Sequence, residues 1–163
     1  MPAQRPGSSE QGVRTPKVFL DAVRVKLGIT DFVMDLAATK ANRVTAEYYS
    51  RRDDALTQMW PSEGVSFLNP PYANISPWVE KAYHESEVGS TTSVLIPAAV
   101  GANYWAKWVH EKAHVFLLNG RIQFVGHTHG YPKDLVLLIY GPHPVHVAEP
   151  WRIPGYEVWR WKP

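Results

Sequence analysis

VSFLNPPYANISPW, residues 65–78, is the stretch that decides the fold. Its first four residues form a short, mostly apolar run that is typical of a buried strand. The prolines at 70 and 71 stop this strand, because proline has no N–H to donate to a sheet. Ser76-Pro77 then predicts a helix start, with serine as the N-cap and proline at the first helical position. The stretch therefore predicts a strand, a rigid turn and a helix, which is the repeating unit of α/β domains.

The same alternation extends to both sides of this stretch. Apolar spacing and capping residues predict helices over 15–28, 37–50 and 76–89 and from 103 onward, and buried strands over 32–36, 65–68, 93–96 and 135–140. Asn119-Gly120, between the apolar runs 115–118 and 122–125, predicts a two-residue hairpin. We therefore expect an α/β fold whose open, mostly parallel sheet carries an antiparallel C-terminal hairpin.

The length of 163 residues predicts one domain with two distinct ends. Residues 1–12 are rich in Pro, Gly, Ser and Gln, and we expect a flexible N-terminal arm there. The folded domain is expected over residues 13–141. Residues 142–163 hold several prolines and tryptophans, which predicts an extended C-terminal tail packed on the domain through its tryptophans.

Composition excludes several classes of function. The chain has no cysteine, which excludes disulfides, cysteine-bound metals and thiol nucleophiles. No apolar run reaches the roughly 18 residues of a membrane span. The N-terminus lacks the apolar core of a secretory signal, so we expect a cytoplasmic protein with no membrane partner. No carboxylates cluster beside the histidines, so no metal is expected. The net charge of +2 is too small to indicate nucleic acid by itself.

The turn 69–72 concentrates hydrogen-bond acceptors beside an aromatic ring. Its two prolines lack N–H groups and leave the carbonyls of Asn69 and Pro70 free, while the Asn69 side chain adds a third acceptor. Tyr72 follows with a flat face. Such a cluster suits a planar group that carries an amino substituent. Asp35 and Asn69 both end predicted strands, and open α/β sheets bind their ligands at the carboxyl ends of the strands.

Asn69-Pro70-Pro71-Tyr72 resembles the catalytic motif of the amino-methyltransferases that use S-adenosylmethionine. From about Gln11 to Tyr140, the chain resembles the small phage-encoded DNA adenine methyltransferases, the phage Dam family. Further segments carry this resemblance in order: Thr15-Pro16, Asp35-Leu36-Ala37-Ala38 with Asn42, Tyr48-Tyr49, DALTQMW at 54–60, Ala73-Asn74 with Trp78 and Lys81-Ala82, LIP at 95–97, and GRIQF at 120–124.

The resemblance implies a Rossmann-like methyltransferase fold and a site-specific reaction. A methyl group would pass from S-adenosylmethionine to the exocyclic amino group of adenine in DNA. The Asn69 side chain and the Pro70 carbonyl would accept hydrogen bonds from that amino group, and Tyr72 would stack on an adenine flipped out of the duplex. The resemblance also implies a phage or prophage gene that acts in a bacterial host cell.

Cofactor contacts implied by the resemblance fall on Thr15, Pro16, Asp35 and Asn69. Asp35 would help to hold the methionine portion of S-adenosylmethionine. Taken by itself, Asp35 fits equally well as the N-cap of the helix expected to follow it.

A second acidic position is implied for the adenine or ribose of the cofactor. Asp54 is the candidate, with Asp53 and Glu47 as rivals. The turn after the first predicted strand, Ala37-Ala38-Thr39-Lys40, contains no glycine, whereas most methyltransferases have a glycine-rich turn there that lets the backbone approach the cofactor.

Substrate contacts are expected from Tyr72, Asn74 and Arg121, the last as a phosphate contact. The chain has no separate target-recognition domain, so DNA sequence would be recognised by short loops such as 73–76 and 126–133. This suggests either a brief recognition site or the help of a second subunit in a homodimer.

Two other functions fit the same residues. The acceptor cluster could equally serve a protein glutamine or an adenine in RNA. A nucleic-acid-binding protein without catalysis is the third hypothesis, and the glycine-free turn supports it. The intact motif at 69–72 favours an enzyme.

Overall fold

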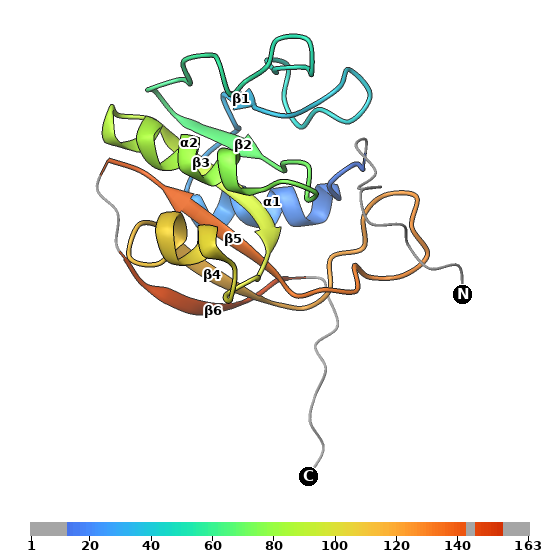
Figure 1. Ribbon diagram of the computed structural model, residues 1–163. Helices are drawn as coiled ribbons and strands as arrows, with labels where there is room; N and C mark the ends of the chain where they lie inside the picture. The colour runs from blue at the N-terminus through green and yellow to red at the C-terminus, as the bar shows by residue number, and fades with distance from the viewer. Residues whose placement is uncertain (1–12, 143–145, 155–163) are drawn as a thin grey trace.

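A six-stranded sheet organises the computed structural model, which describes residues 13–142 and 146–154. The strand order is β1 (Met34–Asp35), β2 (Val65–Leu68), β3 (Thr91–Pro97), β5 (Leu135–Tyr140), β4 (His114–Asn119) and β6 (Ala148–Arg152). In Figure 1 the sheet runs from β1 at the top to β6 at the bottom. The expected N-terminal arm lies outside the described residues.

The sheet mixes parallel and antiparallel strands. Within the described residues, β1–β2, β2–β3 and β4–β6 are parallel pairs. β5 is antiparallel to both of its neighbours, β3 and β4. The expected α/β fold with a mostly parallel sheet and antiparallel strands near the C-terminus is therefore confirmed.

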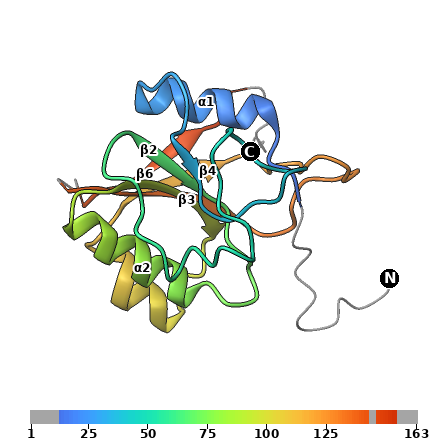
Figure 2. The same cartoon turned by 90° about the horizontal axis from the view of Figure 1, so that it is seen from above.

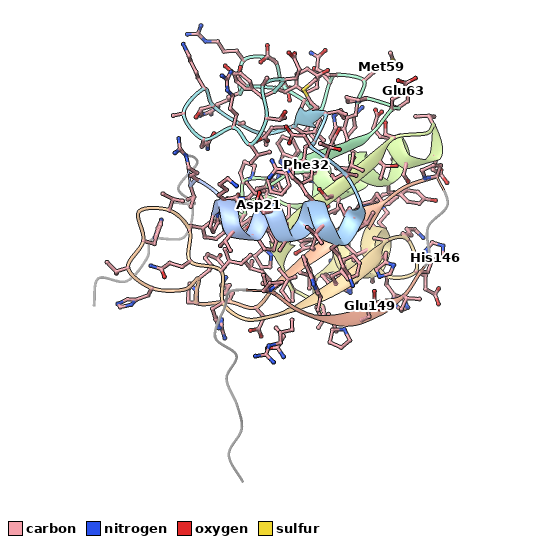
Figure 3. All side chains as sticks on the ribbon, turned by 180° about the vertical axis from the view of Figure 1, so that it is seen from behind. Asp21, Phe32, Met59, Glu63, His146 and Glu149 are labelled. Atoms are coloured by element: carbon pink, nitrogen blue, oxygen red, sulfur yellow. The ribbon has the colours of Figure 1, made fainter. Side chains whose placement is uncertain are left out.

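Helices cover both faces of the sheet, as the view from above shows (Figure 2). Helix α1 (Lys17–Leu27) packs on one face through Phe19, Leu20 and Val23 and ends at Gly28 with φ of 66°. Figure 3 shows α1 crossing this face, with Asp21 on it. Helix α2 (Ser76–Glu87) and the short π-helix η1 (Trp105–Val109) cover the other face.

Ser76 is the first residue of α2 rather than its N-cap. Ile75 occupies the cap position, with no side-chain hydrogen bond at this end of the helix. The carbonyl of Ile75 accepts hydrogen bonds from the backbone N–H groups of Trp78 and Val79. The predicted helix is thus present, but its expected serine cap is wrong.

Residues 37–50 do not form the expected helix. The backbone of Asp35 exchanges hydrogen bonds with this segment, donating to the Glu47 carbonyl at 2.9 Å and accepting from the Tyr49 N–H at 2.8 Å. Its carboxylate also accepts from the Val44 N–H. These contacts draw the segment alongside the end of β1 as an irregular loop, and the prediction from local spacing was wrong.

The two-residue hairpin at Asn119-Gly120 is also wrong. β4 does end at Asn119, but its antiparallel partner is β5, which begins at Leu135. The run 122–125 forms no strand; Val125 instead makes an isolated bridge with Arg14. Ile122 and Phe124 are buried, which accounts for their strand-like alternation. Residues 120–134 therefore form a long loop rather than a tight turn.

The C-terminal region adds an edge strand. β6 pairs with β4, and Pro150 is tolerated there because the outer side of an edge strand needs no donors. Trp151 is buried against Phe19 and Phe116. Residues 143–145 and 155–163 of the expected tail lie outside the described residues. Among the residues described, no helix combines the length and apolar character of a membrane span.

Candidate active site

A cleft of about 1080 Å³ opens at the carboxyl ends of β1 and β2. It is bounded by the segment before α1, by the loop that follows β1, by the turn 69–73 and by the loop 120–134. In Figure 1 the end of β2, the start of α1 and the orange loop 120–134 all lie on the right-hand side. The structure thus gathers three distant parts of the sequence at one edge of the sheet.

Asn69 lies at the cleft, held by one hydrogen bond from its amide nitrogen. Its Nδ2 donates to Thr15 Oγ1 at 3.5 Å. Neither the Asn69 Oδ1 nor the Pro70 carbonyl oxygen accepts a hydrogen bond from the described residues. Both atoms are therefore available as acceptors for a ligand.

Tyr72 is held at its hydroxyl, which donates to the Leu95 carbonyl of β3 at 3.2 Å. Burial raises the pKa of the Tyr72 phenol well above its usual value, and nearby Tyr131 adds to this effect. The phenol is therefore neutral at physiological pH. The Tyr72 ring meets the Tyr131 ring edge-on, with centroids 5.7 Å apart. Its orientation is thus fixed from two sides.

Asp35 is 3% exposed, and its carboxylate accepts two backbone hydrogen bonds. Oδ2 accepts from the Val44 N–H at 3.0 Å, and Oδ1 accepts from the Ala37 N–H at 3.3 Å. Burial raises the pKa of this carboxyl to about 6, against the lowering effect of the two hydrogen bonds. No helix follows Asp35, so the N-cap interpretation is wrong. The carboxylate instead organises a loop.

The turn after β1 uses its own backbone donors. The N–H groups of residues 36–39 donate, in order, to the Phe67 carbonyl, Asp35 Oδ1, the Tyr49 carbonyl and Asn42 Oδ1. Four consecutive amides are therefore satisfied within the protein. This turn offers a ligand side chains and carbonyls rather than backbone N–H groups.

Of the three acidic candidates in the next loop, only Asp54 lines the cleft. Asp53 turns back on Ser50, accepting from its N–H at 2.7 Å and from its hydroxyl at 2.6 Å, and the Ser50 hydroxyl lowers the pKa of that carboxyl. Asp54 has a φ of 48°, a left-handed conformation that aspartate tolerates. Glu47 does not reach the cleft wall.

The structure brings most of the predicted site residues together. Thr15, Asp35, Asp54, Asn69, Pro70 and Tyr72 all line the cleft, whereas Pro16, Asn74 and Arg121 do not. The carbonyl of Pro16 instead accepts the first hydrogen bonds of α1. Asn74 is exposed between the turn and α2.

Several cleft residues had been given no individual role from the sequence. Trp78 in the first turn of α2, Tyr131 and Lys133 in the loop 120–134, and Arg51 in the loop after β1 all line it. Trp78 follows the motif by six residues, a spacing that brings the first turn of α2 back to the turn 69–72. Tyr131 and Lys133 belong to the loop 126–133, which was expected to recognise DNA, but their place at the cleft, like that of Arg51, depends on how two long loops fold. No three metal-binding side chains group together in the described part of the chain.

The family described as DNA N-6-adenine-methyltransferase (Dam) matches residues 4–137 of this chain. A DNA N-6-adenine-methyltransferase of Escherichia phage T1 is 30% identical over 84 residues, which cover 52% of this chain and 34% of that protein. One from Haemophilus phage HP1 is 27% identical over 105 residues, 63% of this chain and 60% of that protein. The matches thus span about a third and three fifths of these relatives.

Among solved structures, the chain matches one described as a predicted O-methyltransferase from Agrobacterium tumefaciens. The match covers 70% of this chain and 58% of that one, with 18% identity and a TM-score of 0.38.

Proposed function

The chain belongs to the DNA N-6-adenine-methyltransferase (Dam) family, and from this premise we propose that it methylates the exocyclic amino group of adenine in DNA, with S-adenosylmethionine as methyl donor. One observation carries the proposal. Asn69 Oδ1 and the Pro70 carbonyl accept no hydrogen bond from the described residues, and they lie in a cleft that is also lined by the carboxylates of Asp35 and Asp54. The cleft therefore suits both an amino group and a cationic cofactor.

The lining of the cleft fits S-adenosylmethionine by its chemistry. Asp35 is a buried carboxylate suited to the ammonium group of the methionine portion, and Asp54 is suited to the ribose hydroxyls. Val13, Val44 and Phe67 provide apolar wall for the rest of the cofactor. A volume of about 1080 Å³ is at the upper end of small-molecule sites, so it has room for a cofactor and a base together.

Asn69 and Pro70 act on the amino nitrogen of the target base. When bound, the cofactor supplies a methyl group on a sulfonium centre. The two acceptors take the amino hydrogens and turn the nitrogen lone pair out of conjugation with the ring. Positive charge grows on this nitrogen during attack, so the acceptors stabilise the transition state more than the ground state. As the nitrogen–methyl bond formed, the methyl–sulfur bond would break and the sulfur would leave as a neutral thioether. The methylated nitrogen would then lose its proton to water, so no dedicated base is needed.

Tyr72 provides the surface on which the flipped adenine stacks. Extrusion of a base costs a few kcal/mol, and stacking on an aromatic ring recovers about 1–3 kcal/mol. The hydroxyl of Tyr72 is anchored to Leu95 and its ring is braced by Tyr131, so the stacking face is in place before DNA binds. A preformed surface of this kind lowers the ordering cost of binding.

The proposal is tested by transfer of labelled methyl from S-adenosylmethionine to unmethylated DNA. Wild-type protein should label adenine, and Asn69→Ala should lower the rate of labelling at least about 10²-fold while it still binds cofactor. Asn103→Ala is the matched control, because Asn103 is exposed and lies outside the cleft. Label in RNA or in protein glutamine, with none in DNA, would support the alternative acceptors. Absence of cofactor binding would refute the proposal that the protein is a methyltransferase.

Partners follow from the same proposal. The substrate is DNA in the cytoplasm of a bacterial host, and binding should weaken with salt because phosphate contacts release counterions. Arg51, in the loop after β1, and Lys133, in the loop 120–134, both line the cleft. Their cationic side chains are the candidates for contacts with DNA phosphates. Sedimentation with and without DNA tests whether a homodimer forms.

A further inference from the structure

The loop 120–134 is a folded unit with its own hydrogen bonds. The Tyr131 N–H donates to the Ile122 carbonyl at 2.7 Å, which closes the loop on itself. Gln123 Nε2 donates to the His127 carbonyl at 2.7 Å, and the Val125 N–H donates to the Arg14 carbonyl at 3.0 Å. The loop is therefore an ordered wall of the cleft, and it is hydrogen-bonded to the segment before α1.

Arg121 joins the two ends of this loop. Its guanidinium donates to the Tyr131 carbonyl at 3.4 Å and pairs with the Asp134 carboxylate at 3.1 Å. The backbone at 130 approaches Arg121 so closely that a Cβ there would lie 2.7 Å from the Arg121 Cβ, so only glycine fits at Gly130. Arg121 thus lies outside the cleft lining, on the exposed side of the loop, and its guanidinium contacts Tyr131 and Asp134 there.

Tyr131 is the residue through which this arrangement reaches the site. Its ring meets Tyr72 edge-on at 5.7 Å and meets buried Phe124 edge-on at 5.8 Å. A shift of the loop backbone at 131 would therefore move the ring that braces Tyr72. Misplacement of about 1 Å at a reacting site can cost about a hundredfold in rate.

We propose that Arg121 is a positioning residue for methyl transfer, which fixes Tyr131, and through it Tyr72, by clamping the loop 120–134 to Asp134. The inference rests on the proposed function and changes the role expected for Arg121. It acts on the rate of the reaction through the loop, and it is not a phosphate contact.

Two substitutions separate the clamp from a phosphate contact. Arg121→Lys keeps the positive charge but loses the forked geometry that reaches both Tyr131 and Asp134. Asp134→Asn removes the other partner and one negative charge. The clamp predicts that both variants lower kcat about tenfold. It also predicts that the combined variant is no worse than either one, because both remove the same interaction.

DNA binding provides the independent readout. The clamp predicts that Arg121→Ala leaves the salt slope of DNA binding unchanged, whereas a lost phosphate contact would reduce the slope by about 0.9. Arg152→Ala, an exposed arginine on β6, is the control. The proposal is overturned if Arg121→Lys retains wild-type kcat, or if Asp134→Asn binds DNA more tightly without a loss in kcat.

Hydrogen exchange keeps the test independent of the proposed function. Amides of residues 120–134 should exchange faster in Arg121→Lys and in Asp134→Asn than in wild type or Arg152→Ala, with no substrate present. Unchanged exchange would overturn the clamp even if methylation occurs. Faster exchange in a protein with no methyltransferase activity would support the clamp and refute the proposed function.

Discussion

Two turns at the same edge of the sheet, 36–39 after β1 and 69–72 after β2, differ in what their backbones leave available. The first turn satisfies all four of its N–H groups within the protein. The second contains two prolines, and its Asn69 and Pro70 oxygens accept nothing from the described residues. The N–H groups of the first turn are all hydrogen-bonded within the protein, while the second turn presents those acceptors to the cleft.

On the proposed function, the contrast explains how a glycine-free turn can lie beside a cofactor site. A backbone that has already satisfied its donors does not need to approach a ligand closely, so Ala37 and Ala38 need not be glycine. The proposed cofactor would then be bound there by side chains, above all Asp35. The proposed methyl transfer at the second turn would depend on oxygen atoms that a rigid, proline-fixed backbone holds in place. The two turns should therefore respond to substitution in different ways.

The largest effect is expected at the second turn. Asn69→Leu keeps the branched shape of the side chain but removes the acceptor, and methyl transfer should fall about 10²–10³-fold, a much larger loss than that in cofactor affinity. Asn69→Asp keeps an acceptor and should lose less. Single-turnover rates and cofactor titrations measure the two quantities separately. Equal losses in both variants would mean that the acceptor is not what Asn69 contributes.

The first turn should show its dependence on Asp35 in a pH-dependent stability. Burial raises the native pKa of Asp35 to about 6, above its usual 3.8, so the native state holds the proton more tightly. The resulting stability is present below about pH 4 and is lost as pH rises through 6. Relative to Asp35→Asn, the wild type should lose up to about 3 kcal/mol over this range. Urea unfolding curves of both proteins at pH 4 and pH 7 measure this loss of stability. The same change in stability with pH in both proteins would contradict the prediction.

Cofactor affinity should show the opposite trend with pH. A carboxylate with a pKa of about 6 is mostly protonated at pH 5, so the wild type should bind S-adenosylmethionine about tenfold more weakly at pH 5 than at pH 7. Asp35→Asn should bind weakly at both pH values. Calorimetric titration measures this. A wild-type affinity that does not change with pH would show that the Asp35 carboxylate does not bind the cofactor.

A smaller effect is expected where the segment before α1 meets the second turn. Thr15→Val removes the acceptor for Asn69 Nδ2 and should lower the methylation rate about fivefold, since one neutral hydrogen bond is worth roughly 1 kcal/mol. Thr92→Val is the matched control, because Thr92 is as buried and its hydroxyl has no partner among the described residues. Similar rates in both variants would show that Thr15 does not position Asn69.

The sequence predicts these two turns unequally, and the reason is the range of the interactions involved. Val65–Leu68, its prolines and α2 follow from neighbouring residues, and the expected strand and helix are present. The loop 37–50 depends on Asp35 reaching Val44 and Tyr49, which no helical spacing reveals. A local pattern therefore predicted a helix where a buried carboxylate organises a loop.

The same reasoning applies to the long loop 120–134. Asn119-Gly120 is a strong local turn signal, yet β4 pairs with β5 because Leu135–Leu138 are all buried in the sheet. The alternation at 122–125 reflects burial of Ile122 and Phe124, and the backbone there finds its partner at Arg14. The contact between Tyr131 and Tyr72 depends on that arrangement. It joins two loops that no short-range pattern relates.

The smallest effect gives the most direct test of the contrast between the turns. If the first turn were simply a glycine-rich turn that has lost its glycine, Ala38→Gly should strengthen cofactor binding. The Ala38 N–H already donates to the Tyr49 carbonyl, and Ala38 is buried, so glycine offers the ligand no new donor. Ala38→Gly should instead leave cofactor affinity unchanged and reduce stability by about 0.5–1 kcal/mol, the entropic cost of glycine in an ordered backbone. Tighter cofactor binding by this variant would show that the backbone of the first turn can still donate to the cofactor, as a glycine-rich turn does.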